Sequence, residues 1–304
     1  MNRPGWWLYR ISGVATPRTG TTGALGAHHT QEGAKVCALV AAESGCAAER
    51  QRSQSRAVPR LVIVVPCYNE EKRLDVEQFR TFDLEGAGLQ FLFVNDGSRD
   101  GTLPILNRLR DSDPKRFAVL NLESNGGKAE AVRRGMLAAL ESSPDIAGFW
   151  DADLATPLEE LPMFLEVFAA RPAIEMVFAA RVRLLGRDIS RRPARHYVGR
   201  VGATLIASSL GLAVYDTQCG AKLFRLTPTY PQLWAVPFLS RWIFDVEIIA
   251  RLVQLRGREA AAAAIYELPI SRWHDVRGSK VKSTDFLRAL ADLRKIRRAY
   301  NARR

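Results

Sequence analysis

The stretch IAGFWDADLATP, residues 146–157, joins a run of five apolar residues to two aspartates one residue apart. An apolar run of this length is typical of a strand buried on both faces of a sheet. Four similar runs lie along the chain, at residues 61–66, 89–96, 117–123 and 175–180. The sequence therefore predicts a sheet, and the two aspartates stand where one of its strands ends.

Amphipathic helical patterns separate these runs. One covers residues 128–141, and another covers residues 157–170 with Thr156 as its N-cap. Strands that alternate with helices form mostly parallel sheets with helices packed on their faces. We therefore expect an α/β fold with a mostly parallel central sheet flanked by helices.

Polar residues follow four of the predicted strands. In sheets of this kind, ligands bind beyond the carboxyl ends of the strands. We therefore expect these four strand ends to share one rim and to form a binding site. They are residues 66–70, 95–98, 125–128 and 151–153.

Asp151 and Asp153 admit three interpretations. Two carboxylates separated by the small Ala152 suit a hard divalent cation, Mg²⁺ or Mn²⁺, which keeps positions open for substrate phosphates. The same two groups could act as a general acid and a general base. As acids that cap the helix beginning near Pro157, they would be structural, although this explains Thr156 better than Asp151.

The neighbouring motifs favour a nucleotide diphosphate as the ligand. SNGGKAEA, residues 124–131, is not a P-loop, because Ala129 stands where that motif requires Ser or Thr. No G-x-G-x-x-G follows the first predicted strand, which argues against a dinucleotide dehydrogenase. The rim therefore offers Asp96, Lys128 and the two aspartates as its chemically active groups.

The chain is strongly basic, with a net charge of +12 and a pI of about 10.0. This charge implies an anionic partner, which could be nucleic acid, anionic lipid or a phosphorylated substrate. No recognisable reading motif or aromatic stacking platform accompanies it, so we expect no nucleic-acid partner; a basic nucleic-acid-binding protein remains the alternative of another class. The four cysteines form no C-x-x-C pair, which favours a reducing compartment, and the four histidines form no zinc pattern.

We divide the chain into three parts. Residues 1–59 are rich in Gly, Ala, Ser, Thr and Arg without a sustained period, which is typical of a disordered arm. Residues 60–282 carry the predicted strands and motifs, and residues 283–304 form a basic helix. The most apolar segment, residues 201–215, is shorter than the ~18 residues of a membrane span, so we expect a buried or interfacial helix there.

The C-terminal helix is predicted to be amphipathic. Its basic residues crowd around the side opposite an apolar face. Such a helix suits an anionic membrane surface, although a solvated helix docked on the domain is an alternative that does not exclude it. We expect a cytoplasmic protein that is attached peripherally to the membrane and has no transmembrane helix. The apolar face comprises Phe286, Leu287, Leu290, Leu293, Ile296 and Tyr300.

Seven motifs in this order resemble those of family 2 glycosyltransferases with the GT-A fold. Among these enzymes, the chain is most similar to the group of dolichyl-phosphate β-glucosyltransferases and polyprenyl-phosphate mannose synthases. The resemblance implies a single Rossmann-like GT-A catalytic domain over residues 60–282. The motifs are VVPCYNE (64–70), VNDGSRDGT (94–102), NGGKAEAVRRG (125–135), DADLATP (151–157), DTQCGAKLF (216–224), RWIFDVE (241–247) and GSKV (278–281).

The resemblance also implies a pocket for a UDP-sugar. Asp151 and Asp153 match the D-x-D motif that carries Mg²⁺ or Mn²⁺ to the diphosphate, and Asp96 would hydrogen-bond the uracil edge. The other positions that it implies, on the donor or the acceptor side, are Pro66, Tyr68, Glu70, Lys128, Arg133, Arg181, Arg191, Arg195, Arg241, Ser279 and Lys280.

The implied reaction is inverting transfer of a hexose to a dolichyl- or undecaprenyl-type phosphate at the cytoplasmic face of a membrane. Ala155 stands where mannose-transferring relatives carry Gln, which favours glucose from UDP-glucose. Another sugar, such as mannose from GDP-mannose, and a glycan acceptor are the alternatives.

Asp153, Asp245 and Arg195 are the candidate catalytic residues. A lipid phosphate is already ionised near neutral pH, so its oxygen needs no strong base. Asp245 or Glu247 would orient the donor sugar, or act as a base toward a hydroxyl acceptor. Both could instead be buried structural acids paired with Arg241.

Overall fold

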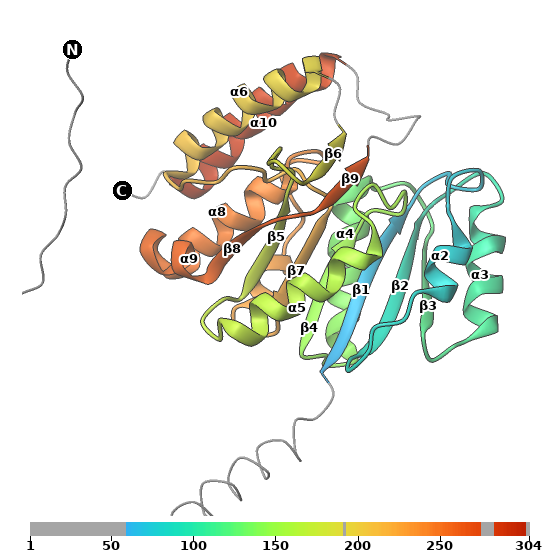
Figure 1. The fold of residues 1–304 in the computed structure, drawn as a ribbon. Coiled ribbons are helices and arrows are strands. Elements are labelled where there is room, and N and C mark those ends of the chain that lie inside the picture. The colour runs from blue at the N-terminus through green and yellow to red at the C-terminus, as the bar shows by residue number, and fades with distance from the viewer. Residues whose placement is uncertain (1–58, 191–192, 275–282, 302–304) are drawn as a thin grey trace, which may run out of the picture. The chain divides into compact units, whose positions relative to one another are not determined.

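The computed structural model describes residues 59–190, 193–274 and 283–301, which belong to one compact unit (Figure 1). The arm predicted to be disordered lies outside the described residues, apart from its last residue.

A seven-stranded sheet forms the centre of this unit. Its strand order is β3-β2-β1-β4-β7-β5-β8, and only β7 runs antiparallel to its neighbours. The predicted mostly parallel α/β sheet is therefore confirmed. The strands are β1 (Arg60–Cys67), β2 (Gly88–Asp96), β3 (Phe117–Leu122), β4 (Ile146–Trp150), β5 (Met176–Ala180), β7 (Ala221–Arg225) and β8 (Ile265–Pro269).

The sheet is buried on both faces. Along β1, Leu61, Ile63 and Val65 enter one hydrophobic core, whereas Val62 and Val64 enter a second core on the opposite face. Successive side chains of a strand point to opposite faces. A strand between two cores therefore needs apolar residues at every position, which explains the uninterrupted runs in the sequence.

Helices cover both faces of the sheet (Figure 1). Helix α4 (Lys128–Glu141) begins and ends where the pattern predicts, and Gly135 lets it approach the sheet, because a Cβ there would lie 2.4 Å from Val64 Cγ1. The other helices are α2 (Val76–Thr81), α3 (Thr102–Ser112), η1 (Leu158–Glu160), α5 (Leu161–Ala170), α6 (Pro193–Leu210), α7 (Tyr230–Trp234), α8 (Phe244–Arg256), α9 (Arg258–Ala264) and α10 (Ser283–Asn301).

The start of the helix after β4 differs from the prediction. Pro157 is extended, with φ −61° and ψ 150°, and a single 3-10 turn precedes α5. Thr156 therefore lies too far from α5 to act as its N-cap. Its carbonyl instead accepts a hydrogen bond of 2.7 Å from the indole nitrogen of Trp150, which fixes the turn to the end of β4.

The segment predicted to be a buried or interfacial helix packs by one face only. In α6, Ile206 and Leu210 are buried, whereas Val201 is 58% exposed and Leu205 is 42% exposed. No helix that the structure describes is both long enough and apolar enough to cross a bilayer.

Helix α10 docks on the domain, where it contacts α8 and α6 (Figure 1). Ile296 is fully buried in the second core, and Leu293 and Tyr300 pack against the same core. The basic side chains that the structure describes on this helix are exposed: Arg288, Arg294, Lys295, Arg297 and Arg298. A two-stranded parallel sheet of β6 (Asp188–Ser190) and β9 (Arg272–His274) completes the fold.

Candidate active site

The carboxyl ends of β1, β2 and β4 lie along one rim of the sheet, because these strands are parallel neighbours. The loop before α4 and the first turn of α8 reach the same rim. Lys128 contacts Asp151 there, and Asp245 lies close enough to interact electrostatically with both residues. Residues from three separate sequence motifs therefore meet in one place.

The D-x-D turn is held in a defined conformation. The Asp151 N–H donates to the Gly220 carbonyl of the antiparallel strand segment at 3.0 Å, and the Leu154 N–H closes the turn on the Asp151 carbonyl at 3.1 Å. Leu154 has φ +50°, which is uncommon for a residue with a branched side chain. Such local strain persists only where the surrounding structure imposes it, and it concentrates at functional sites.

Gly220 makes room for the first aspartate. A Cβ at this position would lie 1.9 Å from Asp151 Oδ2, so any larger residue would displace the carboxylate. The side chain of Asp151 thus occupies a space that exists only because residue 220 is glycine.

Lys128, the first residue of α4, neutralises Asp151. Its Nζ lies 2.5 Å from Asp151 Oδ1, and both side chains are partly exposed. Partial burial would lower the pKa of Lys128, but the attraction of Asp151, and of Asp245 and Asp153 beyond it, raises that pKa above its usual value. Lys128 is therefore a persistent cation at the rim.

Asp153 lies beside a like charge. Burial and the repulsion of Asp151 raise its pKa, and the Ala155 N–H, which donates to Asp153 Oδ1 at 3.2 Å, opposes this effect. Two carboxylates that destabilise each other's charge gain from a cation placed between them. They also match the one or two carboxylates by which proteins usually hold Mg²⁺ together with substrate phosphates. The residues present therefore fit a divalent metal.

Asp96 shapes the loop before α4. Its two oxygens accept hydrogen bonds from the Gly126 N–H at 2.7 Å, the Gly127 N–H at 2.8 Å and the Asn125 side-chain amide at 2.9 Å. Arg241 covers the same loop, and its Nε donates to the Gly126 carbonyl at 3.0 Å. The structure thus joins Asp96, predicted on the donor side, to Arg241, predicted as an acceptor-side or loop residue, through a loop of three residues.

Asp245, near the start of α8, binds a lysine from the middle of the sheet. Lys222 Nζ lies 2.7 Å from Asp245 Oδ1, and the lysine side chain is fully buried. Burial raises the pKa of Asp245, although Lys222 and Lys128 act in the opposite direction. Glu247, by contrast, points away from the rim and pairs with Arg251 at 2.7 Å. Neither acid is paired with Arg241 in the contacts described.

Three other predicted site residues form ion pairs within the protein. Arg181 forms a bidentate pair with Asp216 at 2.7 and 2.8 Å, and this attraction keeps its pKa above the usual value although burial opposes it. Arg133 pairs in the same way with Glu130, and Glu70 pairs with Arg73. Each of these charges is therefore compensated by a partner within the protein.

The remaining predicted residues divide into two sets. Pro66 and Tyr68 are partly buried at the end of β1 and just beyond it, beside the rim. Arg191, Ser279 and Lys280 lie outside the described residues. The backbone of Arg195 belongs to α6, but its side chain is outside the described part of the structure.

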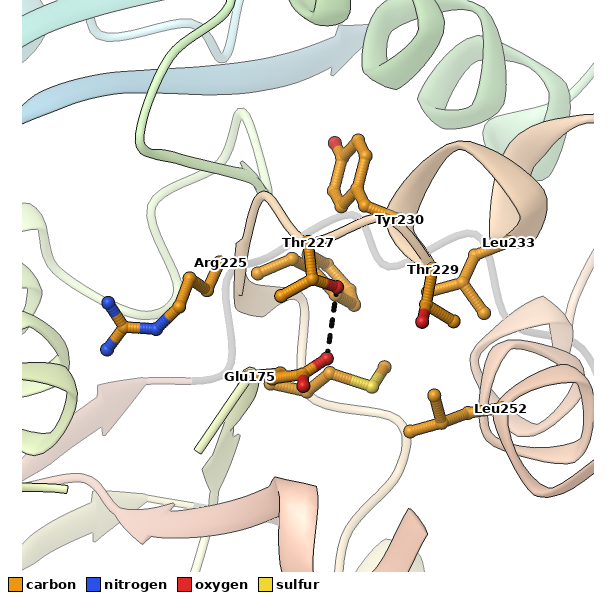
Figure 2. Close-up of a pocket in the computed structure, with 9 residues that line it drawn as sticks. Glu175, Arg225, Thr227, Thr229, Tyr230, Leu233 and Leu252 are labelled. Atoms are coloured by element: carbon orange, nitrogen blue, oxygen red, sulfur yellow. Dashed lines mark hydrogen bonds between the residues drawn. The ribbon is translucent and has the colours of Figure 1, made fainter. Parts of the chain in front are cut away.

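The small cavity in Figure 2 is not part of this rim. It has a volume of about 10 Å³ and lies among the start of β5, the end of β7 and α7, where Thr227 donates to Glu175 at 3.1 Å. A space of this size is just sufficient for one water molecule. A larger hollow of about 450 Å³, lined by Arg60, Gly88 and Arg116, also lies at the amino ends of strands, away from Asp151.

Comparison with known proteins identifies the family. The model of the family described as Glycosyl transferase family 2 matches residues 62–229, more than half of the chain. The chain belongs to glycosyl transferase family 2. The family 2 assignment suggested by the motifs is thereby confirmed.

Curated relatives of this family 2 glycosyltransferase match most of the chain. The dolichyl-phosphate β-glucosyltransferase of Drosophila melanogaster is 31% identical, over 73% of this chain and 69% of its own length. The enzyme of the same name from Saccharomyces cerevisiae is 29% identical, over 83% of this chain and 81% of its own. The chain is thus related to the group that its motifs resemble.

Solved structures confirm the fold. Glucosyl-3-phosphoglycerate synthase from Mycobacterium tuberculosis, in complex with Mn²⁺, UDP-glucose and phosphoglyceric acid, superposes with a TM-score of 0.56. The match covers 79% of this chain and 80% of that one at 18% identity. The family 2 glycosyltransferase therefore has the GT-A fold expected from its sequence.

Two residues that contact predicted site residues, Gly220 and Lys222, were not themselves predicted from the sequence. Lys222 is a charged residue inside an apolar strand, and Gly220 lies against the D-x-D carboxylate. Both fall in the motif DTQCGAKLF, and a lysine within an otherwise apolar strand was the signal available, since a fully buried lysine is rare unless it is paired.

Proposed function

We propose that this family 2 glycosyltransferase transfers glucose from UDP-glucose to a polyprenyl phosphate, with inversion at the anomeric carbon. The observation that carries the proposal is the meeting of Lys128, Asp151 and Asp153 on the rim that also holds the Asp96 loop. The names of the relatives, dolichyl-phosphate β-glucosyltransferases, support this acceptor class and this sugar. We assign the catalytic domain to residues 60–282.

The donor nucleotide would bind along the ends of β1 and β2. Pro66, Tyr68 and Glu70 would line this region. Asp96 binds the amides of the 125–127 loop around the position proposed for the uracil. Because Asp96 already accepts three hydrogen bonds, we assign to it the shaping of the base site as well as contact with the base.

The diphosphate would lie over Lys128 and the two aspartates. Asp151 and Asp153 would hold Mg²⁺ or Mn²⁺, which supplies a positive charge that stabilises the departing diphosphate. Lys128 adds a second cation from the start of α4, where the helix dipole also favours an anion. These charges stabilise the group whose negative charge grows as the bond to the sugar breaks.

In the proposed reaction, an ionised phosphate oxygen of the acceptor forms a bond to the anomeric carbon, and the bond from that carbon to UDP breaks. The acceptor oxygen carries no proton near neutral pH, so no residue has to remove one. Asp245 is fixed by Lys222 and would orient the sugar or the Lys128 ammonium. The proposed acceptor-side, donor-side and loop residues include two that the structure describes, Arg181 and Arg241. Four more lie beyond the described side chains: Arg191, Arg195, Ser279 and Lys280.

Ala155 supports glucose as the sugar. Its N–H contacts Asp153, and its methyl group packs against the first core, so it offers no polar side chain beside the metal ligands. The exposed basic residues described on α10 support peripheral attachment to an anionic membrane at the cytoplasmic face, because Leu293, Ile296 and Tyr300 of that helix already pack on the domain.

Incubation with Mn²⁺ or Mg²⁺, polyprenyl phosphate and separate UDP- and GDP-sugars tests the proposal. We expect lipid-linked glucose from UDP-glucose. Transfer from GDP-mannose alone would replace the donor, and transfer only to a glycan would replace the acceptor. Metal-replete protein that transfers no sugar from any donor would overturn the proposed function.

A further inference from the structure

Residues 235–243, which connect α7 to α8 and are called the Arg241 loop below, carry the arginine that binds the loop around Asp96. Arg241 reaches across to the loop before α4, where its Nε donates to the Gly126 carbonyl at 3.0 Å and its Nη2 donates to the Asn125 side-chain oxygen at 3.2 Å. Asn125 in turn donates to Asp96 at 2.9 Å. The position of Arg241 is therefore linked to the geometry of Asp96 by direct contacts.

A buried ion pair holds the Arg241 loop from behind. The Arg251 guanidinium donates to the carbonyls of Val236 at 2.9 Å and Pro237 at 2.9 Å. Glu247 is fully buried, and its Oε2 accepts from the Leu239 N–H at 2.8 Å, while its Oε1 accepts from Arg251 at 2.7 Å. A buried pair of this kind is favourable only when its remaining hydrogen-bonding groups are also satisfied.

Helix α10 supplies the missing partners. Tyr300 Oη donates to Glu247 Oε1 at 2.8 Å and accepts from Arg251 Nε at 3.2 Å. Two turns earlier, Asp292 Oδ2 accepts from Ser240 Oγ at 2.8 Å. Ser240 is adjacent to Arg241, and its Oγ accepts the Ile243 N–H at 3.0 Å, near the start of α8. The helix thus fixes the Arg241 loop directly through Ser240 and indirectly through Glu247.

We infer that Tyr300 and Asp292 of α10 are positioning residues for the donor nucleotide, acting through the Arg241 loop on the loop that binds Asp96. The inference rests on the proposed function, because it takes the Asp96 site as the place of the uracil. It assigns to the C-terminal helix a role in donor binding, although neither residue reaches the rim itself.

Calorimetric titration tests the inference without the need for turnover. The probes are UMP without metal and UDP with Mn²⁺, added to wild-type protein and to the Tyr300→Phe and Asp292→Ala variants. Tyr300→Phe removes the hydrogen bonds to Glu247 and from Arg251. Asp292→Ala removes the bond from Ser240 and the exposed ion pair with Lys295. We expect about fivefold weaker binding in each variant. The loss of affinity relative to wild type should be equal for UMP and UDP, because the affected contacts lie at the proposed site of the base and not at the metal.

Three further variants separate positioning from general damage. Tyr230→Phe removes a buried hydroxyl that donates to the Met136 sulfur, its one hydrogen bond among the described residues, and should leave both affinities unchanged. Asp292→Asn keeps an oxygen that accepts from Ser240 and should restore binding. In an Arg241→Ala background, Tyr300→Phe should cause no additional loss, because its effect is transmitted through the Arg241 loop.

The outcomes are distinct. Folded wild-type protein that binds neither UMP nor UDP would overturn the proposed function, and this inference with it. Wild-type binding that Tyr300→Phe and Asp292→Ala leave unchanged would overturn the inference alone. A loss confined to UDP, or a loss of the same size for Tyr230→Phe, would also count against it.

Discussion

Lys222 Nζ lies 2.7 Å from Asp245 Oδ1, and the lysine is fully buried in the middle of the sheet. The ammonium also lies over the rings of Phe149 at 5.3 Å and Phe178 at 5.4 Å. A cation in such surroundings is tolerated because the carboxylate and the ring faces replace the water that it has lost. The pair connects the interior of the sheet to the rim.

Removing the lysine alone should destabilise the protein strongly. In Lys222→Met, Asp245 keeps its buried position without its partner, and an uncompensated buried charge costs about 3–5 kcal/mol. Denaturant unfolding measures this free energy. The matched double variant Lys222→Met/Asp245→Asn should recover part of the loss, because it buries no charge; a double variant less stable than Lys222→Met would contradict the pairing.

Asp153→Asn should abolish transfer while leaving the fold intact. The substitution removes a carboxylate proposed to hold the metal, and we expect turnover to fall by at least about 100-fold. Without metal, the variant should be at least as stable as wild type, because the repulsion between Asp151 and Asp153 is gone. Turnover comes from a radiolabelled transfer assay, and stability comes from thermal unfolding.

Metal linkage gives the second measurement on the same variant. Mn²⁺ at 100 times its Kd should stabilise wild-type protein by about 2.7 kcal/mol. The free energy of unfolding of Asp153→Asn should rise much less at the same Mn²⁺ concentration. Equal stabilisation of both proteins would show that the cation binds elsewhere.

Short-range patterns account for much of the fold. The five apolar runs became β1 to β5 because each lies between two cores, and α4 follows its apolar period from Lys128 to Glu141. β7 was not predicted, because it carries Lys222 in its centre and is an antiparallel strand inserted between β4 and β5. Its place depends on pairing with distant strands, which a local pattern does not contain.

In the candidate site, too, local patterns predicted some features, whereas contacts between distant segments were not predicted. The order of strand ends placed Asp96, Lys128 and the D-x-D acids near one another, because neighbouring parallel strands end at one edge. The sequence did not reveal which carboxylate each arginine would bind. Arg181 and Arg133 were expected to face the ligand, and the structure pairs them with Asp216 and Glu130. Such pairings depend on side chains that meet only in the folded chain.

Gly220→Ala should impair the metal site without a change in any charged group. The new Cβ would lie 1.9 Å from Asp151 Oδ2 and would push the carboxylate away from its position. A misplacement of about 1 Å can cost about 100-fold in rate. The matched control is Gly88→Ala at the opposite end of the sheet, where the nearest atom to a Cβ would be 3.9 Å away.

The transfer assay and Mn²⁺ titration report the effect of Gly220→Ala. We expect weaker metal binding and lower turnover in this variant, and wild-type values in Gly88→Ala. Full activity of Gly220→Ala would mean that the position of Asp151 does not matter for the reaction.

Reversal of charge on α10 should weaken attachment to anionic vesicles. Arg297 and Arg298 are exposed on this helix, whose apolar residues Ile296 and Tyr300 face the domain. Each basic residue near an anionic membrane contributes about 1 kcal/mol, so Arg297→Glu/Arg298→Glu should bind such vesicles at least about tenfold more weakly. Co-sedimentation with phosphatidylserine-containing vesicles at low salt measures this binding, with Arg110→Glu on α3 as the control.

The same double variant should keep the wild-type affinity for UMP, because neither arginine contacts the Arg241 loop in the described structure. Undiminished vesicle binding by the double variant would place the membrane contact on another surface.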